Sequence, residues 1–211
     1  MRIFKRKLYE KLLDWKNNRS GRTAVLIEGA RRVGKSTLAR QFAQNEYESY
    51  VMIDFSIVKK DILELFDSIA DLDYFFLQLQ FRLGVSLKER KSLIIFDEVQ
   101  MCPKARQAIK HLVADGRYDY IETGSLISIR KNVKDIVIPS EEEKMILHPL
   151  DYEEFKWALG DTTTIAQMRM IFEKRLSMGD AVTRKLMRDF RLYMAVGGMP
   201  QAVCEYLETN N

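Results

Sequence analysis

The feature that most constrains the fold is a glycine-punctuated segment between an apolar run and a helical pattern. Residues 29–36 read Gly-Ala-Arg-Arg-Val-Gly-Lys-Ser and match the pattern G-x-x-x-x-G-K-[ST]. The apolar run 23–27 before them is typical of a strand buried on both faces. The pattern after them predicts a helix with Leu38, Ala39 and Phe42 on one side. A glycine turn between a strand and a helix places backbone N–H groups around an anion, so the segment predicts a phosphate-binding loop.

The side chains at the end of this loop have the chemistry to hold a triphosphate and a metal ion. Lys35 is expected to contact the β- and γ-phosphates, and the Ser36 hydroxyl is expected to be a magnesium ligand. Arg31 and Arg32 either meet phosphate or form a solvated pair on the loop surface. The predicted nucleotide contacts run through the whole loop, over Gly29, Ala30, Arg31, Arg32, Val33, Gly34, Lys35, Ser36 and Thr37.

A second apolar run ends in two adjacent acids. Residues 92–96 are followed directly by Asp97 and Glu98. Like charges at the end of a buried strand repel unless a cation lies nearby, and a magnesium–nucleotide complex supplies one. Asp97 is therefore expected to hold the metal, directly or through water, and Glu98 to polarise a water molecule for in-line attack on the γ-phosphate. The alternative is an exposed acidic strand end.

A third run, residues 118–123, is followed by Gly124 and Ser125. On a neighbouring strand, the hydroxyl of Thr123 or Ser125 could hold the attacking water or the γ-phosphate; the alternative is an ordinary turn. The predicted catalytic residues are therefore Glu98, Lys35, Thr123 and Ser125, and the predicted metal ligands are Ser36 and Asp97.

The rest of the chain alternates strand and helix patterns. Strands are expected at 50–55 and 144–147, and helices at 3–16, over 57–86 in two pieces, and after Pro103. Residues 126–140 fit either a hairpin or an irregular excursion. The sequence after residue 151 is mostly helical, and Asp151 with Glu154 predicts a capping box. The alternation favours an α/β fold with a parallel sheet covered on both faces.

Three segments resemble motifs of AAA+ type ATPases. Residues 29–36 resemble Walker A, Asp97 with Glu98 resembles Walker B, and residues 123–125 resemble sensor 1. The likeness is greatest to an archaeal and bacterial group with a GARRVGKS-type loop, whose members usually carry an uncharacterised C-terminal domain. Residues 148–155 and 197–200 also look like landmarks of that group. The resemblance implies ATP and Mg²⁺ as cofactors.

The resemblance also implies a fold and a division of the chain. The expected fold is a three-layer P-loop NTPase with a parallel five-stranded sheet in the order 5-1-4-3-2 and a C-terminal helical extension. Residues 1–155 are the expected ATPase core, and residues 156–211 the expected helical extension, the start of a lid or of a C-terminal region that is cut short. Strand 50–55 can be the additional strand that this group has in the chain between the strands that carry the two Walker motifs.

The N-terminal part of the chain is strongly basic. Residues 1–40 hold 12 Lys and Arg against 3 Asp and Glu, in a chain whose net charge is +4. Part of this charge belongs to the phosphate loop. Lys5, Arg6, Lys7 and Lys11 cluster on the expected first helix, where they either contact nucleic acid or form a solvated face. An arginine finger that reaches phosphate is sought among Arg106, Arg117, Arg130 and Arg191.

The leading functional hypothesis is an ATP-binding, magnesium-dependent ATPase that couples hydrolysis to ADP and phosphate with conformational change or assembly. The alternatives are a nucleotide-gated binding module with little hydrolysis and a nucleic-acid-stimulated ATPase. The possible partners are a second copy of the chain, a nucleic acid or a protein client. No apolar run approaches the roughly 18 residues of a membrane span. With no secretory signal pattern and two distant Cys, a cytoplasmic location is expected.

Overall fold

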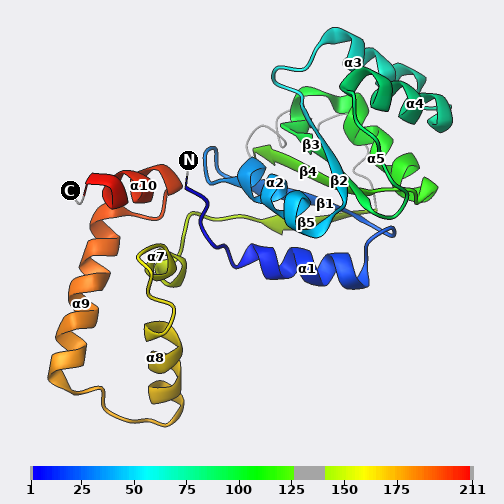
Figure 1. Cartoon of the computed structure of the whole chain (residues 1–211). Coiled ribbons are helices and arrows are strands. Elements are labelled where there is room, and N and C mark those ends of the chain that lie inside the picture. The colour runs from blue at the N-terminus through cyan, green and yellow to red at the C-terminus, as the bar shows by residue number, and fades with distance from the viewer. Residues whose placement is uncertain (1, 126–140, 210–211) are drawn as a thin grey trace. The chain divides into compact units, whose positions relative to one another are not determined.

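The computed structural model describes residues 2–125 and 141–209 and contains a parallel β-sheet (Figure 1). Within these residues the sheet has five strands in the order β2-β3-β4-β1-β5, and every neighbouring pair is parallel. The strands are β1 (Ala24–Gly29), β2 (Ser49–Asp54), β3 (Ser92–Asp97), β4 (Asp119–Ser125) and β5 (Glu142–Ile146). This confirms the α/β fold and the expected order 5-1-4-3-2. The expectation for residues 126–140 lies outside the described residues.

Helices cover both faces of the sheet. Val51 and Ile53 of β2 belong to one apolar cluster with residues of α3 (Lys60–Leu65), η1 (Phe66–Ser68), α4 (Leu72–Leu83) and α5 (Pro103–Asp115). The alternate residues Tyr50 and Met52 contact the opposite layer, where α2 (Lys35–Glu46) supplies Gln44 and Arg40 as their hydrogen-bond partners. Alternating side chains of a strand point to opposite faces, so the fold has the expected three layers.

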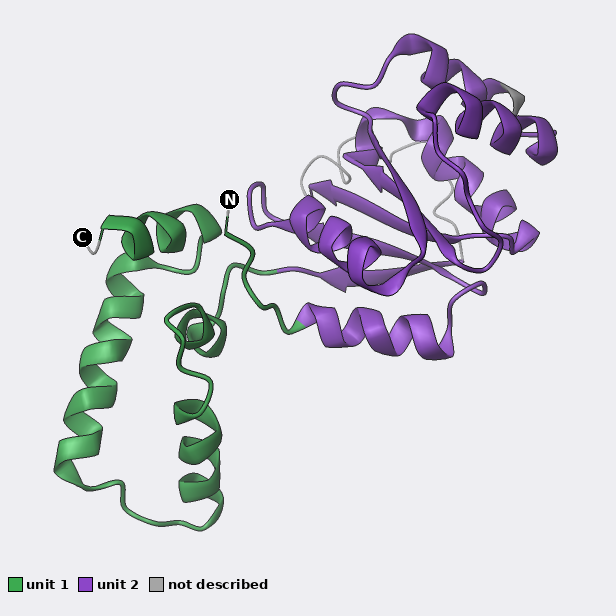
Figure 2. Cartoon of the chain, in the orientation of Figure 1, with its two compact units in different colours: residues 1–7, 148–211 green, residues 8–147 purple. Residues whose placement is uncertain are grey.

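The chain divides into two compact units, which Figure 2 distinguishes by colour. One is the sheet unit, residues 8–147, which also contains α1 (Leu8–Asn18) and η2 (Val99–Met101). The other is the helical unit, residues 1–7 and 148–211, with α7 (Tyr152–Ala158), α8 (Thr164–Glu173), α9 (Gly179–Val196) and α10 (Pro200–Thr209). The division expected after residue 155 stays a prediction. None of the described helices combines the length and apolar content that a membrane span requires.

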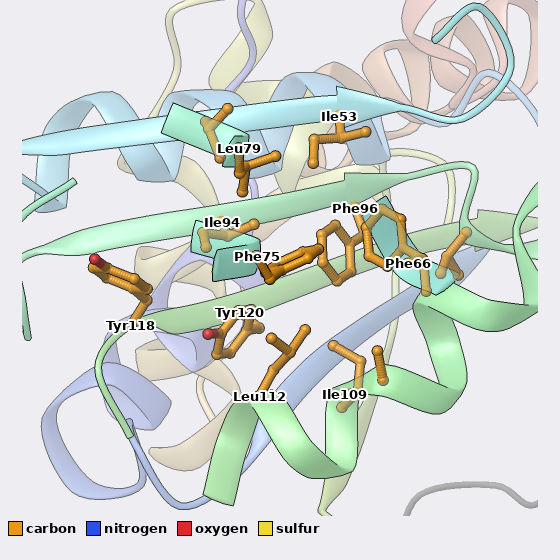
Figure 3. Packing of buried hydrophobic residues seen from close by; sticks show 14 of the residues in the cluster. Ile53, Phe66, Phe75, Leu79, Ile94, Phe96, Ile109, Leu112, Tyr118 and Tyr120 are labelled. Atoms are coloured by element: carbon orange, nitrogen blue, oxygen red, sulfur yellow. The ribbon is translucent and has the colours of Figure 1, made fainter. Parts of the chain in front are cut away.

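Aromatic rings fill the core between the sheet and α4 and α5 (Figure 3). The ring of Phe66 lies 5.3 Å from that of Phe75 and 5.6 Å from that of Phe96, both edge to face. The ring of Tyr118 lies 4.9 Å from that of Phe76. Edge-to-face packing of this kind stabilises a core beyond the area it buries. The core thus supports β3, the strand that ends at Asp97, directly before Glu98.

The two sequence landmarks of the helical unit, residues 148–155 and 197–200, contact each other. Leu150 N donates a hydrogen bond to Gly198 O at 2.7 Å, and a Cβ atom at position 198 would lie 2.1 Å from Leu150 O. Only glycine allows this approach. The capping box predicted at the start of α7 is confirmed, because the side chains of Asp151 and Glu154 each accept a backbone N–H of the other residue.

The first helix begins later than expected, at Leu8 instead of residue 3. Residues 5–7, which precede α1, contact the segment 148–157 within the helical unit. Arg6 is buried against Glu154, Lys7 Nζ lies 2.6 Å from Asp151 Oδ2, and Lys5 lies over the Trp157 ring. These ionic contacts replace helical hydrogen bonds. They also engage three of the four cations considered for nucleic acid, while Lys11 stays exposed on α1.

Two arginine-finger candidates have structural roles. Arg106 is 1% exposed and its guanidinium contacts both carboxylate oxygens of Glu142, at 3.1 and 3.2 Å. Arg117 binds Asp115 and Asp73 and lies over the Phe76 ring. Neither side chain is available to reach a phosphate. Arg130 lies outside the described residues, and Arg191 is exposed on α9.

A buried carboxyl beside this ion pair makes stability depend on pH. Burial raises the pKa of Glu122 well above its ordinary value of 4.5, and the neighbouring Glu142 raises it further. The folded chain therefore keeps a proton that the unfolded chain releases, so stability declines as pH rises from about 4.5 through the folded pKa. We expect Glu122→Gln to flatten this decline and to raise the free energy of unfolding at pH 8 by about 1–3 kcal/mol.

Urea denaturation at a series of pH values measures both effects. Glu64→Gln on α3 is the control, because Glu64 is exposed and should leave the slope unchanged. If the free energy of unfolding of Glu122→Gln declines with pH as steeply as that of the unmodified chain, the buried proton does not belong to Glu122.

Candidate active site

The predicted phosphate loop joins the end of β1 to the start of α2. Gly34 has a φ of 97° and precedes α2 directly, and Arg32 also has a positive φ, of 67°. Gly34 has no side chain to cap the helix, so the N–H groups of the first turn stay available to an anion. A Cβ atom at Gly29 would lie 2.2 Å from Leu147 O, so the first glycine is required by the backbone beside it.

Lys35 lies within the loop rather than in solvent. It is 5% exposed, and its Nζ donates hydrogen bonds to Gly29 O at 3.2 Å and Ala30 O at 2.9 Å. Burial lowers the pKa of Lys35, while the carboxylates of Glu98 and Asp97 act in the opposite direction. The ammonium group is thus held beside the loop carbonyls by weak neutral acceptors, which a phosphate can replace with stronger, charged ones.

Residues of α2 and β4 both contact one carboxylate oxygen of Asp97, the last residue of β3. Ser36 Oγ donates to Asp97 Oδ1 at 2.7 Å, and the buried hydroxyl of Thr123 donates to the same oxygen. Ser36 and Asp97 therefore present hard oxygen donors side by side, which is the donor set that Mg²⁺ prefers. These two predicted metal ligands fit the ion.

Glu98 is held in an uncommon backbone conformation next to this group. Its φ is 53° and its ψ 45°, in the left-handed region that non-glycine residues seldom adopt. Its N–H donates to Thr123 Oγ1 at 3.3 Å, and its Oε2 accepts a hydrogen bond from Gln100 Nε2. Such strain is concentrated at functional sites, where the surrounding structure maintains it.

The other predicted residues surround the loop less closely. Val33 is buried and anchors the loop in the core, Thr37 is half-buried in the first turn of α2, and Arg31 and Arg32 are exposed. Ser125 is half-buried and pairs in register with Gly29. The structure thus brings Lys35, Ser36, Asp97, Glu98 and Thr123 together, and it places Ser125 at the strand end beside the start of the loop.

Sequence reasoning missed two polar residues at the same edge of the sheet. Asp54 ends β2 and pairs in register with Asp97, and its Oδ1 accepts hydrogen bonds from Ser56 N and Oγ at 2.9 and 2.6 Å. Its signal was an acid near the end of an expected strand, the same pattern as Asp97. Gln100 touches Glu98 but has no sequence signal, because its place depends on the turn after β3.

A parallel sheet in this order with a lysine-bearing glycine loop before α2 defines a P-loop NTPase. Residues 21–156 match the family model described as an AAA domain, which is well over half of the chain. The chain therefore belongs to this AAA family and is a member of the AAA+ superfamily of P-loop ATPases. A search of the curated proteins found no match.

A solved structure of an archaeal ATPase shows the same fold. The Walker-type ATPase PABY2304 of Pyrococcus abyssi matches with a TM-score of 0.54 and 19% identity, over 99% of this chain and 69% of that one. The Aeropyrum pernix Orc1 protein in complex with DNA matches over 75% of this chain and 49% of that one, with 12% identity and a TM-score of 0.49. C. elegans PCH-2 matches over 78% of this chain and 44% of that one, with 17% identity and a TM-score of 0.38.

Proposed function

We propose that this chain binds ATP with Mg²⁺ and hydrolyses it to ADP and phosphate. One observation carries the proposal: the hydroxyls of Ser36, from the phosphate loop, and Thr123, from β4, both donate to Asp97 Oδ1, directly beside Glu98. The residues proposed to bind triphosphate, to hold the metal ion and to position water therefore lie together at the carboxyl edge of the sheet. Ligands of open α/β sheets bind at this edge.

Each residue of this group has a role in the proposed reaction. The loop N–H groups and Lys35 bind the β- and γ-phosphates, and Ser36 and Asp97 hold the metal ion. When bound, Mg²⁺ neutralises charge on the phosphate oxygens. Glu98 accepts a hydrogen bond from the attacking water and orients it in line with the γ-phosphate, and Thr123 or Ser125 holds the water or the γ-phosphate.

A contact between two of these residues favours coupling of nucleotide state to conformation. The Thr123 hydroxyl donates to Asp97 and accepts from the N–H of Glu98. A change at the γ-phosphate that moves Thr123 therefore also moves the strained backbone of Glu98. This supports the proposal that hydrolysis is coupled to conformational change or assembly.

The second candidate is a nucleotide-gated binding module with little hydrolysis of its own. It is favoured by the pairing of Arg106 and Arg117 with carboxylates of the same unit, which removes two candidates for an arginine finger. Stimulation by nucleic acid is less favoured, because Lys5, Arg6 and Lys7 contact residues 148–157.

The test is phosphate release by the purified chain, measured beside calorimetric ATP binding and solution mass. We expect ATP binding and phosphate release that both require Mg²⁺ and are lost in EDTA, with GTP tested in parallel. Binding without release supports the binding module. Release that rises on addition of DNA or RNA and weakens with salt supports the nucleic-acid-stimulated ATPase. Absence of binding overturns the proposal.

A further inference from the structure

Gln100 is the side chain that contacts the carboxylate of Glu98. It lies in η2, the short 3₁₀ turn after β3, and it is 9% exposed. Its Nε2 donates a hydrogen bond to Glu98 Oε2. A buried amide directed at a half-buried carboxylate forms a charge-assisted hydrogen bond, which is stronger than one between neutral groups.

The local backbone explains why these two residues meet. Side chains two positions apart do not face each other on a regular helix. Here the left-handed conformation of Glu98 reverses the chain, and the turn closes with hydrogen bonds from Met101 N to Glu98 O at 2.9 Å and from Cys102 N to Val99 O at 3.0 Å. Val99, between the two, is fully buried in the apolar core. The position of Gln100 is therefore set by the core.

We propose that Gln100 is a positioning residue that orients Glu98 toward the attacking water. This inference rests on the proposed ATPase function. The hydrogen bond occupies Oε2 of Glu98 and limits rotation of the carboxylate, so that Oε1 is presented to water in one direction. The backbone of Glu98 is held on its other side by Thr123. Glu98 is thus held both at its backbone N–H and at its carboxylate.

A purely structural role for Gln100 makes a different prediction. If the amide only satisfies polar groups in the turn, its removal lowers stability and affects ATP binding and turnover in proportion to the folded fraction. If it orients Glu98, its removal lowers kcat while the KM for ATP and the affinity for ATP stay nearly constant. Small misplacement of a catalytic group is enough to slow turnover greatly.

The experiment is the substitution Gln100→Met, which keeps the length of the side chain and removes its N–H donors. We expect kcat for phosphate release to fall about 10- to 100-fold, with KM and calorimetric ATP affinity changed less than about 2-fold. Gln44→Met is the matched control, because Gln44 is exposed on α2 and bonds Tyr50 instead.

A double-mutant cycle separates positioning from structural support. Glu98→Asp has a shorter side chain that cannot reach Gln100, so in that background Gln100→Met should change kcat less than about 2-fold. An equal fall in both backgrounds, an unchanged kcat or a faster turnover in Gln100→Met overturns the inference while the unmodified chain still hydrolyses ATP. Failure of the unmodified chain to release phosphate instead overturns the proposed function.

Discussion

Lys35→Ala is expected to abolish ATP binding. Nζ of Lys35 is buried inside the phosphate loop, where it donates to the carbonyls of Gly29 and Ala30, and Lys35 is the predicted ligand of the β- and γ-phosphates. Its removal takes away a charge-assisted hydrogen bond in a site with little solvent, so we expect the ATP affinity to fall at least about 100-fold. Isothermal titration calorimetry with Mg-ATP measures this loss directly.

The stability of the free chain distinguishes this loss from misfolding. Burial disfavours the charged form of Lys35, so Lys35→Ala should melt at the same temperature as the unmodified chain or slightly higher. ATP should raise the melting temperature of the unmodified chain but not of the variant. Arg40→Ala, which removes an exposed cation from the same helix, is the control and should bind ATP normally. Undiminished binding by Lys35→Ala rules out the assigned role of Lys35.

Glu98→Gln is expected to retain ATP binding and lose turnover. The amide keeps the shape of the carboxylate, and its oxygen can still accept the hydrogen bond from Gln100. It is a much poorer acceptor for the proton of the attacking water, and positioned bases contribute about 10²- to 10⁴-fold to rates. We therefore expect phosphate release to fall at least about 100-fold, measured under single-turnover conditions to separate chemistry from product release.

Two comparisons make the Glu98 result specific. Glu64→Gln, a neutralised acid on the surface of α3, should keep the full rate. The ATP affinity of Glu98→Gln should stay within about 3-fold of the unmodified chain, since Glu98 does not lie among the predicted phosphate ligands. A variant that releases phosphate at the full rate removes Glu98 from its proposed role and directs attention to Asp54, a further acid at this edge.

Local sequence patterns predicted the strands of the sheet and the loop between β1 and α2. The run 23–27, the glycine loop and Leu38, Ala39 and Phe42 form a strand, a turn and a helix for reasons contained within about 20 residues. The apolar run before Asp97 predicted a buried strand ending in carboxylates, and β3 ends at Asp97. The strand order came from resemblance to a family, because period and composition do not specify which strands pair.

Contacts between distant residues were not predictable in the same way. The partner of Arg106 is Glu142, 36 positions away, and nothing near Arg106 shows that it is buried. The late start of α1 depends on Lys7 and Asp151, which are 144 positions apart. Gln100 reaches Glu98 only because Glu98 adopts a positive φ, a backbone choice made by the surrounding core. Tertiary packing thus decided these features against local propensity.

Leu147 contacts the first glycine of the phosphate loop, Gly29, at the point where the chain leaves the sheet unit. The carbonyl of Leu147 lies against the first glycine of the phosphate loop, and its N–H donates to Glu28 O at 2.7 Å. Leu147 is also the last residue of the sheet unit, so the backbone leaves for the helical unit at the very atoms that support the loop. Backbones packed this closely cannot shift independently. A movement of the phosphate loop at Gly29 therefore meets the backbone of Leu147, the residue after which the chain continues into residues 148–211.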